Sequence, residues 1–204
     1  MGKATSGKGR NRPVRVPSKR ECLDLMERYN GRDHIIRHCI RVAEVALSIS
    51  RELNRRGENL DLDVVEAGAL LHDITKAESL DSGEDHSLSA YRLLRTLGYV
   101  RVADIVRQHV FLLKESDSPW ISEEEVVNYS DKRVRHDQIV TLRERFEDLR
   151  ARYCRDEAGK EWMERMESFS NRMERKIFSK LDIEPEDLRS LRTERESTED
   201  EIQL

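Results

Sequence analysis

The apolar residues of this chain recur at the period of an α-helix, and ionisable residues share their positions. Between residues 32 and 56 one stripe consists of Ile35, His38, Val42, Val45, Ala46, Ile49 and Leu53. Spacings of three and four residues place such a stripe on one helix face, where it faces a core. Because no segment shows the alternation typical of a half-buried strand, we predict an all-α fold.

The composition indicates amphipathic helices and argues against a nucleic-acid-binding domain, a disulfide-rich protein or a membrane protein. Hydrophobic residues make up 37% of the chain and charged residues 38%, which is typical of helices with heavily charged outer faces. A net charge of −4 gives no argument for nucleic-acid binding by the whole domain. The three cysteines are scattered, which indicates free thiols. With no apolar run of membrane-spanning length and no signal-peptide core, we expect a cytoplasmic protein without a membrane partner.

We divide the chain into four parts by charge and pattern. They are a basic disordered tail (1–17), a main domain (18–140), a charged helical extension (141–195) and a frayed tail (196–204). A phosphate-binding arm is the lesser alternative for the first part. The extension reads as one or two helices between residues 141 and 180, with few apolar positions, and it can either cap the core or form a homodimer contact.

Local signals place the helices of the main domain. Capping boxes at Ser18–Glu21 and Ser122–Glu125 predict two helix starts. Further helices are expected at about 32–56, from Asp61 to the His72-Asp73 pair, at 86–97 and at 100–113, with a polar connection at 74–85 that turns at Asp81-Ser82-Gly83. Gly68 lowers helix stability, so we predict that it allows close helix packing.

Histidines and aspartates on the apolar sides of these helices are the strongest functional signal. The candidates are His38, His72, Asp73, His86, His109 and Asp131. None is decisive alone: a single histidine is readily explained as a hydrogen-bonded core residue, and the His72-Asp73 pair as a helix cap, whereas Asp131 needs a specific partner. So many buried ionisable groups together indicate a divalent metal. Imidazole and carboxylate without thiolate suit iron or manganese best, with zinc, cobalt, nickel and magnesium also allowed. The set is large enough for two ions bridged by one carboxylate, and such a pair can activate water and polarise a phosphoryl oxygen.

The residues around these candidates resemble a known family. "HCIRVAEVA" contains His38, "AGALLHDITK" contains the His72-Asp73 pair and "NYSDKRV" contains Asp131. Their order resembles the HD-domain (HDIG-type) metal-dependent phosphohydrolases over roughly residues 30–140. The additional His86 and His109 are similar to the dinuclear branch, which includes YqeK-type dinucleotide hydrolases and HD-GYP phosphodiesterases. The GYP signature itself is absent.

The resemblance implies roles for these residues and an HD-type helical bundle with additional C-terminal helices. One ion would be held by His38, His72, Asp73 and Asp131. A second would be held by Asp73 as the bridge, with His86 and His109, and completed by water or substrate phosphate. Lys76 matches the lysine of the family's HD-x-x-K pattern, which implies phosphate binding or leaving-group stabilisation, so that Asp73 and Lys76 are the expected catalytic residues.

Other polar residues are weaker candidates. His34 lies one turn before His38, and His136 is expected at the surface. Cations near the ligands suit a phosphate substrate, and among them we favour Lys132 and Arg133, which follow Asp131 directly, over Arg37 and Arg41.

The expected function is hydrolysis of a phosphate ester or anhydride of a nucleotide or other small phosphorylated metabolite by a metal-bound hydroxide. One alternative is an HD-type oxygenase with a mixed-valent di-iron site, which oxygen dependence of turnover would distinguish. A second is a non-catalytic metal-binding regulatory module, in which the charged helices recruit a partner.

Overall fold

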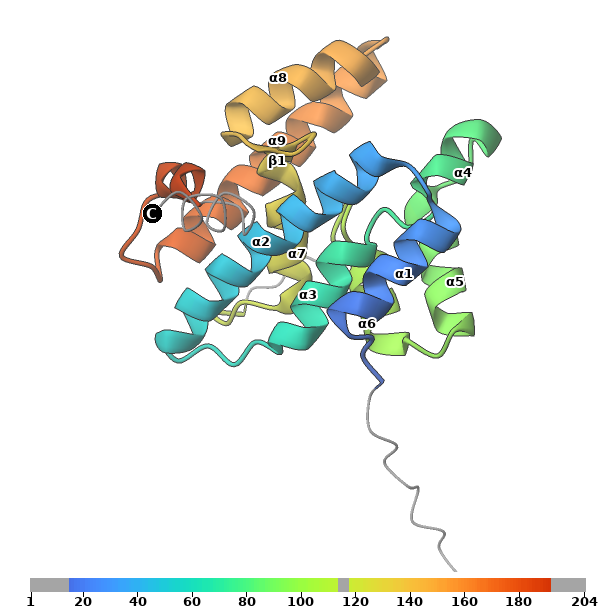
Figure 1. Cartoon of the computed structure of the whole chain (residues 1–204). Coiled ribbons are helices and arrows are strands. Elements are labelled where there is room, and N and C mark those ends of the chain that lie inside the picture. The colour runs from blue at the N-terminus through green and yellow to red at the C-terminus, as the bar shows by residue number, and fades with distance from the viewer. Residues whose placement is uncertain (1–14, 114–117, 192–204) are drawn as a thin grey trace, which may run out of the picture.

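The computed structural model describes residues 15–113 and 118–191, and the predictions for residues 1–14 and 196–204 lie outside this part (Figure 1). The described elements are α1 (Lys19–Tyr29), α2 (Asp33–Arg55), α3 (Leu62–Leu71), α4 (Lys76–Ser82), α5 (His86–Thr96), α6 (Val100–Val106), α7 (Glu123–Lys132), β1 (Val134–Arg135), β2 (Gln138–Ile139), α8 (Leu142–Tyr153), α9 (Glu157–Phe178) and the 3₁₀ helix η1 (Pro185–Ser190). The all-α prediction is confirmed, since the one sheet described is a hairpin of two-residue strands.

Side-chain caps fix where several helices begin. The Ser18 and Ser122 hydroxyls accept hydrogen bonds from the backbone N–H groups of Glu21 and Glu125, and both glutamates accept from the cap N–H in return. Both predicted capping boxes are therefore confirmed. A third box, Thr141 with Glu144, begins α8. Such reciprocal bonds satisfy N–H groups that have no partner inside the helix.

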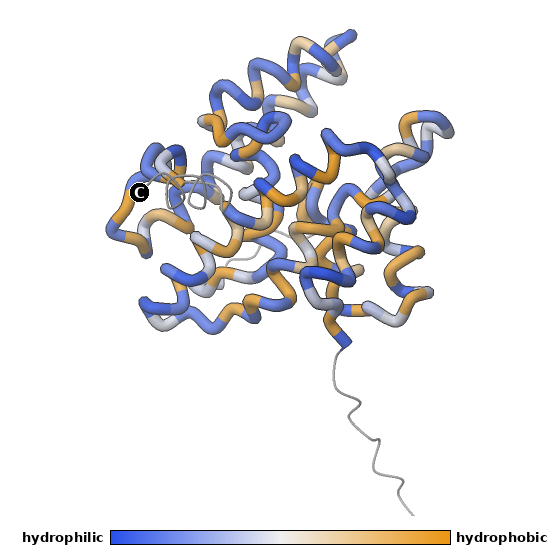
Figure 2. Tube along the Cα trace, viewed as in Figure 1, coloured by the Kyte–Doolittle hydropathy of each residue, from blue (hydrophilic) through white to orange (hydrophobic). Residues whose placement is uncertain are grey.

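The core forms where the apolar faces of α2, α3 and α7 meet. α2 packs along α3 and α7, while α3 also contacts α1 and α6 (Figure 1). Every residue of the predicted α2 stripe is buried, His38 included. Figure 2 shows apolar segments gathered inside this group of helices and mainly hydrophilic chain along α8. The heavily charged outer faces follow from the composition.

Gly68 brings α3 close to α6. A Cβ atom at this position would lie 2.7 Å from Cγ2 of Ile105, which is closer than real Cβ contacts. The prediction that Gly68 serves close packing is therefore confirmed. This close approach holds the end of α3, which carries the His72-Asp73 pair, near the chain that follows α6.

The C-terminal helix α9 is joined to the core by buried polar contacts. Glu174 accepts a hydrogen bond from the Tyr129 hydroxyl at 2.6 Å and pairs with Arg133 at 3.1 Å. Lys176 pairs with Glu125 of α7 at 2.7 Å. α9 packs on α7, and α8 packs on α9, so that α9 connects α8 to the main domain (Figure 1).

The structure corrects three local expectations. The predicted polar connection at 74–85 contains the helix α4, since Ala77 and Ser79 face inward and Gly83, with φ +76°, ends the helix. The predicted helix at 100–113 already ends at Val106 and gives way to turns. Residues 15–17, assigned to the tail, pack on the protein, where Pro17 is buried. None of the described helices is both long and apolar enough to span a membrane, and the described cysteines are free thiols.

Candidate metal centre

Six ionisable side chains from five separate parts of the fold meet at one place. Only His38, within α2, lies in the middle of a long helix. The others lie at helix ends: His72 and Asp73 directly follow α3, His86 begins α5, His109 follows α6, and Asp131 is the penultimate residue of α7. The imidazole rings form a chain, with centroid distances of 5.3 Å (His38–His72), 4.9 Å (His72–His109) and 5.0 Å (His86–His109).

The first ligand group consists of His38, His72 and Asp73, whose ligand atoms lie within 4.8 Å of one another. Asp131 adjoins this group: its Oδ1 lies 3.1 Å from Nε2 of His38 and 3.7 Å from Nε2 of His72. The structure therefore brings together the four residues that the resemblance assigns to one ion.

The second group consists of Asp73, His86 and His109, and it shares Asp73 with the first. Oδ2 of Asp73 lies 3.4 Å from Nε2 of His72. Oδ1 lies 3.4 Å from Nε2 of His86 and 3.5 Å from Nε2 of His109. One carboxylate thus offers one oxygen to each group, which is the arrangement of a bridging ligand.

Backbone carbonyls orient three of the imidazoles. Nδ1 lies 2.8 Å from the His136 carbonyl oxygen in His38, 2.7 Å from that of Ala69 in His72 and 2.7 Å from that of Val106 in His109. When Nδ1 donates to these carbonyls, the lone pair of Nε2 points into the cluster. Metal-bound histidines in proteins use this arrangement. His136 itself has an exposed ring, as predicted, and contributes only its carbonyl.

Two atoms at the centre of this cluster have no hydrogen-bond partner in the described part of the chain: Nε2 of His72 and Oδ1 of Asp73, both buried. A buried acceptor without a partner costs about 1–3 kcal/mol, and more when it is charged. A divalent cation in each ligand group would give both atoms a partner, His72 in the first group and Oδ1 of Asp73 in the second. The residues present therefore fit a divalent metal ion.

Burial favours the metal-binding form in three of the four imidazoles; in His72 burial also acts to lower the pKa, but Cys39 and Asp73 outweigh it and raise the pKa well above the usual range. Burial lowers the pKa of His38 and of His109. For His86, burial and the neighbouring His109 lower the pKa to about 4. Neutral imidazole is the metal-binding form, so these three rings need to lose no proton near neutral pH.

Two lysines keep the carboxylates ionised. Nζ of Lys76 lies 2.6 Å from Oδ2 of Asp73, and Nζ of Lys132 lies 2.6 Å from Oδ2 of Asp131. Burial acts to raise the pKa of each carboxyl group, but Lys76 beside Asp73 and Lys132 beside Asp131 outweigh it and hold both pKa values well below the ordinary range. Both lysines therefore lie at the centre, already paired with ligands.

Arg133 is not brought to this centre. Its guanidinium is fully buried and donates to the Tyr129 hydroxyl at 2.5 Å, the Val140 carbonyl at 2.7 Å and the Pro185 carbonyl at 2.8 Å. With its donors directed at these groups and at Glu174, Arg133 joins α7 to the C-terminal elements. This placement leaves the predicted phosphate contact by Arg133 without support.

A pocket of about 670 Å³ opens over the metal centre. α4, α8 and α9 form its other walls, and their lining residues include Leu80, Arg145, Leu149, Arg152, Tyr153, Trp162, Met163 and Met166. Leu149, Trp162 and Met166 are among the few apolar residues of the charged extension, for which the sequence left both a cap over the core and a dimer contact open. The two arginines carry no sequence signal that separates them from other arginines of the extension. A homodimer through these helices stays a prediction.

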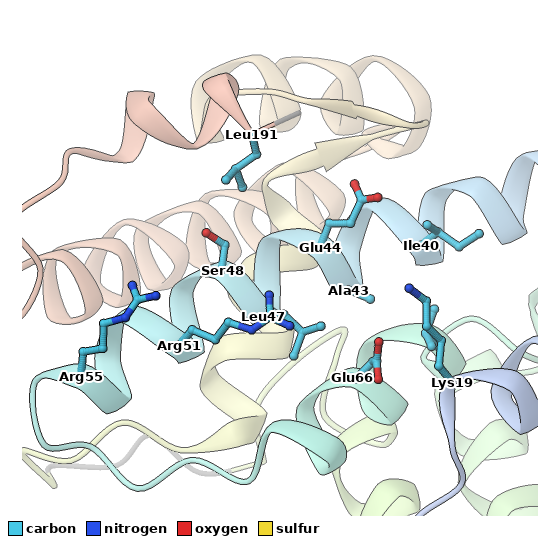
Figure 3. A pocket seen from close by; sticks show the side chains of 11 residues that line it. Lys19, Ile40, Ala43, Glu44, Leu47, Ser48, Arg51, Arg55, Glu66 and Leu191 are labelled. Carbon is cyan, nitrogen blue, oxygen red and sulfur yellow. The ribbon is translucent and has the colours of Figure 1, made fainter. Parts of the chain in front are cut away.

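A second pocket, of about 340 Å³, lies along α2 and includes Lys19, Glu44, Arg51 and Glu66 (Figure 3). Its lining residues include none of the six candidate ligands. Of these two pockets, only the larger one therefore contains the metal centre.

A known protein family matches the part of the sequence that contains the candidate ligands. The sequence matches the HD domain family over residues 35–155, a range that contains all six candidate ligands and extends through α8. A tRNA (cytidine(56)-2'-O)-methyltransferase from Thermoplasma volcanium is 29% identical over 156 residues, which are 70% of this chain and 44% of that protein. A similarly named protein from Picrophilus torridus is 28% identical over 63% of this chain and 40% of its own length.

An uncharacterised protein from Methanocaldococcus jannaschii is 29% identical over 38% of this chain and 46% of its own length. The chain thus spans less than half the length of these relatives. The crystal structure of a predicted HD superfamily hydrolase from an uncultured Thermotogales bacterium has a TM-score of 0.45 and 22% identity, covering 81% of this chain and 94% of that one. Because the family match covers more than half of the sequence and all six candidate ligands, this chain belongs to the HD domain family.

Proposed function

We propose that this protein is a metal-dependent phosphohydrolase that cleaves a phosphate ester or anhydride of a nucleotide or another small phosphorylated metabolite. The observation that carries the proposal is the carboxylate of Asp73, which faces two ligand groups at the floor of an open pocket. Divalent ions bound there would lower the pKa of a coordinated water and polarise a phosphoryl oxygen.

The protein's own groups suit such a site. The second ligand group offers only Asp73, His86 and His109, so further coordination positions are open to water or substrate. Lys76 and Lys132 hold the two carboxylates ionised and in place. Both lysines also line the pocket, where their charge favours an anion.

The outer part of the pocket favours a substrate with a flat organic group. Tyr153 and Trp162 are 58% and 43% exposed and both line the pocket, beside the exposed Leu80. Stacking of a base on an aromatic side chain contributes about 1–3 kcal/mol, so such a wall suits a nucleotide. Two relatives, of which this chain matches less than half, are tRNA (cytidine(56)-2'-O)-methyltransferases by name, and a nucleotide substrate is compatible with that likeness. Recognition of a dinucleotide by a YqeK-type enzyme falls within the same proposal.

The test is release of phosphate from a panel of nucleotides, dinucleotides and sugar phosphates by protein loaded with manganese or iron. We expect hydrolysis by the wild type and its loss in Asp73→Asn. Asp24→Asn is the matched control, because Asp24 is exposed on α1, away from the cluster, and makes the same change of charge. Equal activity of Asp73→Asn and wild type would contradict the proposal.

Two alternatives make different predictions in the same assay. For a di-iron oxygenase, turnover would require oxygen and would be absent under anaerobic conditions with every phosphorylated compound. For a regulatory module, the protein would bind metal and phosphate but hydrolyse none of the panel. Aerobic and anaerobic reactions with the same preparation separate the three cases.

A further inference from the structure

Arg145, on α8, lines the pocket over the metal centre and is a buried cation without close hydrogen-bond partners. Its side chain is only 10% exposed, and its Nε is buried with no hydrogen-bond partner in the described part of the chain. Nη1 lies 3.5 Å from Oδ2 of Asp148, and Nη2 lies 4.0 Å from Oδ1 of Asp131. Charge-assisted hydrogen bonds are normally about 2.7–2.9 Å long, so neither contact is a full partner.

The other cations of the pocket have close partners. Nζ of Lys76 and of Lys132 each lie 2.6 Å from a carboxylate oxygen. Arg152 lies 2.7 Å from Oδ1 of Asp148. Among these four pocket cations, Arg145 therefore keeps the most unused donors, although it is more buried than Arg152. A buried charge with unsatisfied donors is costly unless an anion completes it.

We propose that Arg145 binds the phosphoryl oxygens of the substrate at the metal centre. This inference rests on the proposed function and assigns the substrate's anionic group a specific partner. Oδ1 of Asp131 lies 4.0 Å from Nη2 of Arg145, 3.1 Å from Nε2 of His38 and 3.7 Å from Nε2 of His72. A phosphate at the ligand groups is thus within reach of the guanidinium, whose planar fork matches two phosphate oxygens.

A purely structural role for Arg145 would be to tie α8 to α7 through Asp131 and Asp148. The 3.5 and 4.0 Å distances make such a tie weak. The capping box at Thr141 and the packing of α8 on α9 already position this helix. The two roles are separable, because only the phosphate role predicts an effect on the affinity for inorganic phosphate.

The experiment is calorimetric titration of inorganic phosphate into metal-loaded full-length protein, with metal content and melting temperature measured on the same samples. We expect Arg145→Gln to weaken phosphate binding at least tenfold while metal content stays at the wild-type level. Arg145→Lys, which keeps the charge but loses the fork, should recover only part of the affinity. Arg143→Gln is the matched control, because Arg143 lies on the same helix with its side chain 86% exposed, and it should leave the affinity unchanged.

Asp148→Asn separates binding from helix positioning, because it removes the negative charge near Arg145 and leaves the guanidinium in place. We expect it to keep phosphate affinity within about twofold of wild type. An equal loss in Asp148→Asn and Arg145→Gln, or an unchanged affinity in Arg145→Gln with metal bound, would overturn the inference. If Arg145→Gln does not fold, Arg145→Lys is used in its place, and an unchanged phosphate affinity with metal bound would then overturn the inference. Phosphate binding that depends on Arg145 without hydrolysis of any substrate would refute the proposed function alone.

Discussion

Replacing Gly68 by alanine tests whether the close approach of α3 and α6 holds the metal centre together. Alanine is favoured over glycine inside a helix by about 1 kcal/mol. Against this gain, the new Cβ would lie 2.7 Å from Cγ2, 3.4 Å from Cβ and 3.5 Å from Cδ1 of Ile105. These are branched core atoms that cannot swing away, and overpacking of this kind costs about 1–3 kcal/mol. We therefore expect Gly68→Ala to lower the free energy of unfolding by roughly 1 kcal/mol, measured by urea denaturation.

The second variant, Ile105→Ala, gives this reasoning its sharpest test. Truncation of a buried isoleucine is itself destabilising by about 2–5 kcal/mol, but it removes Cγ2 and Cδ1 and leaves only Cβ, 3.4 Å from the new Cβ, which is an ordinary contact distance. In that background Gly68→Ala should become neutral or stabilising by up to about 1 kcal/mol, because only the gain in helix propensity remains. If Gly68→Ala destabilises both backgrounds equally, the contact with Ile105 is not the cause and the reasoning is refuted. Metal content should fall in Gly68→Ala and recover in the double variant, because moving α3 from α6 moves Asp73 from His109.

Three further predictions concern the centre and the helices around it. Asp73→Ala should reduce bound metal below one equivalent by elemental analysis, because both ligand groups share this carboxylate; full retention would exclude a bridge. Arg133→Met should lower the free energy of unfolding by about 3 kcal/mol, since it leaves the Val140 and Pro185 carbonyls without this donor and the partly buried Glu174 without its counter-charge. Phosphate affinity should stay unchanged. Hydrogen bonds from the Thr141 backbone and from Arg189 lower the pKa of Glu144 from 4.5 to about 2. The ionised Glu144 therefore stabilises the fold fully above pH 4.5, and this stabilisation is lost as the pH falls towards 2. Glu144→Gln should be less stable than wild type in urea denaturation at pH 6, and the two stabilities should converge at low pH.

The helices were predictable where the signals are local. A capping box needs only four adjacent residues, and both predicted boxes, at Ser18 and Ser122, are present. The stripe that contains His38 needs only the helical period, and it is buried as expected. The helix α4, inside the predicted connection at 74–85, was missed because most of its residues are polar. It is helical through contacts that its sequence does not show, with Ala77 and Ser79 facing inward.

The metal centre was predictable because its residue types are unusual on apolar helix faces. Arg145 was not, because arginine is abundant in the extension and only its burial beside Asp131 sets it apart. An apolar stripe shows that a helix face is covered but not by what, so Trp162 and Met166 suggested a cap and a dimer contact equally. Their position in the wall of the pocket depends on how α9 packs against α7, through contacts of Glu174 and Lys176 that are distant in sequence.

The placement of the ligands at helix ends explains why their orientation depends on more than the helices. Four of the six, His72, Asp73, His86 and His109, lie at or beyond a helix terminus, where the backbone hydrogen bonds of the helix no longer constrain the chain. Asp85 compensates at α5 by accepting from the N–H groups of Ser87 and Leu88, and backbone carbonyls do so for the rings of His72 and His109. The fold therefore directs ligand atoms from separate elements at one point, although two of them, on His72 and Asp73, are left without a hydrogen-bond partner there in the described chain. Such an arrangement lowers the stability of the fold without metal and becomes favourable when cations bind. The centre is therefore better explained by metal binding than by a contribution to stability.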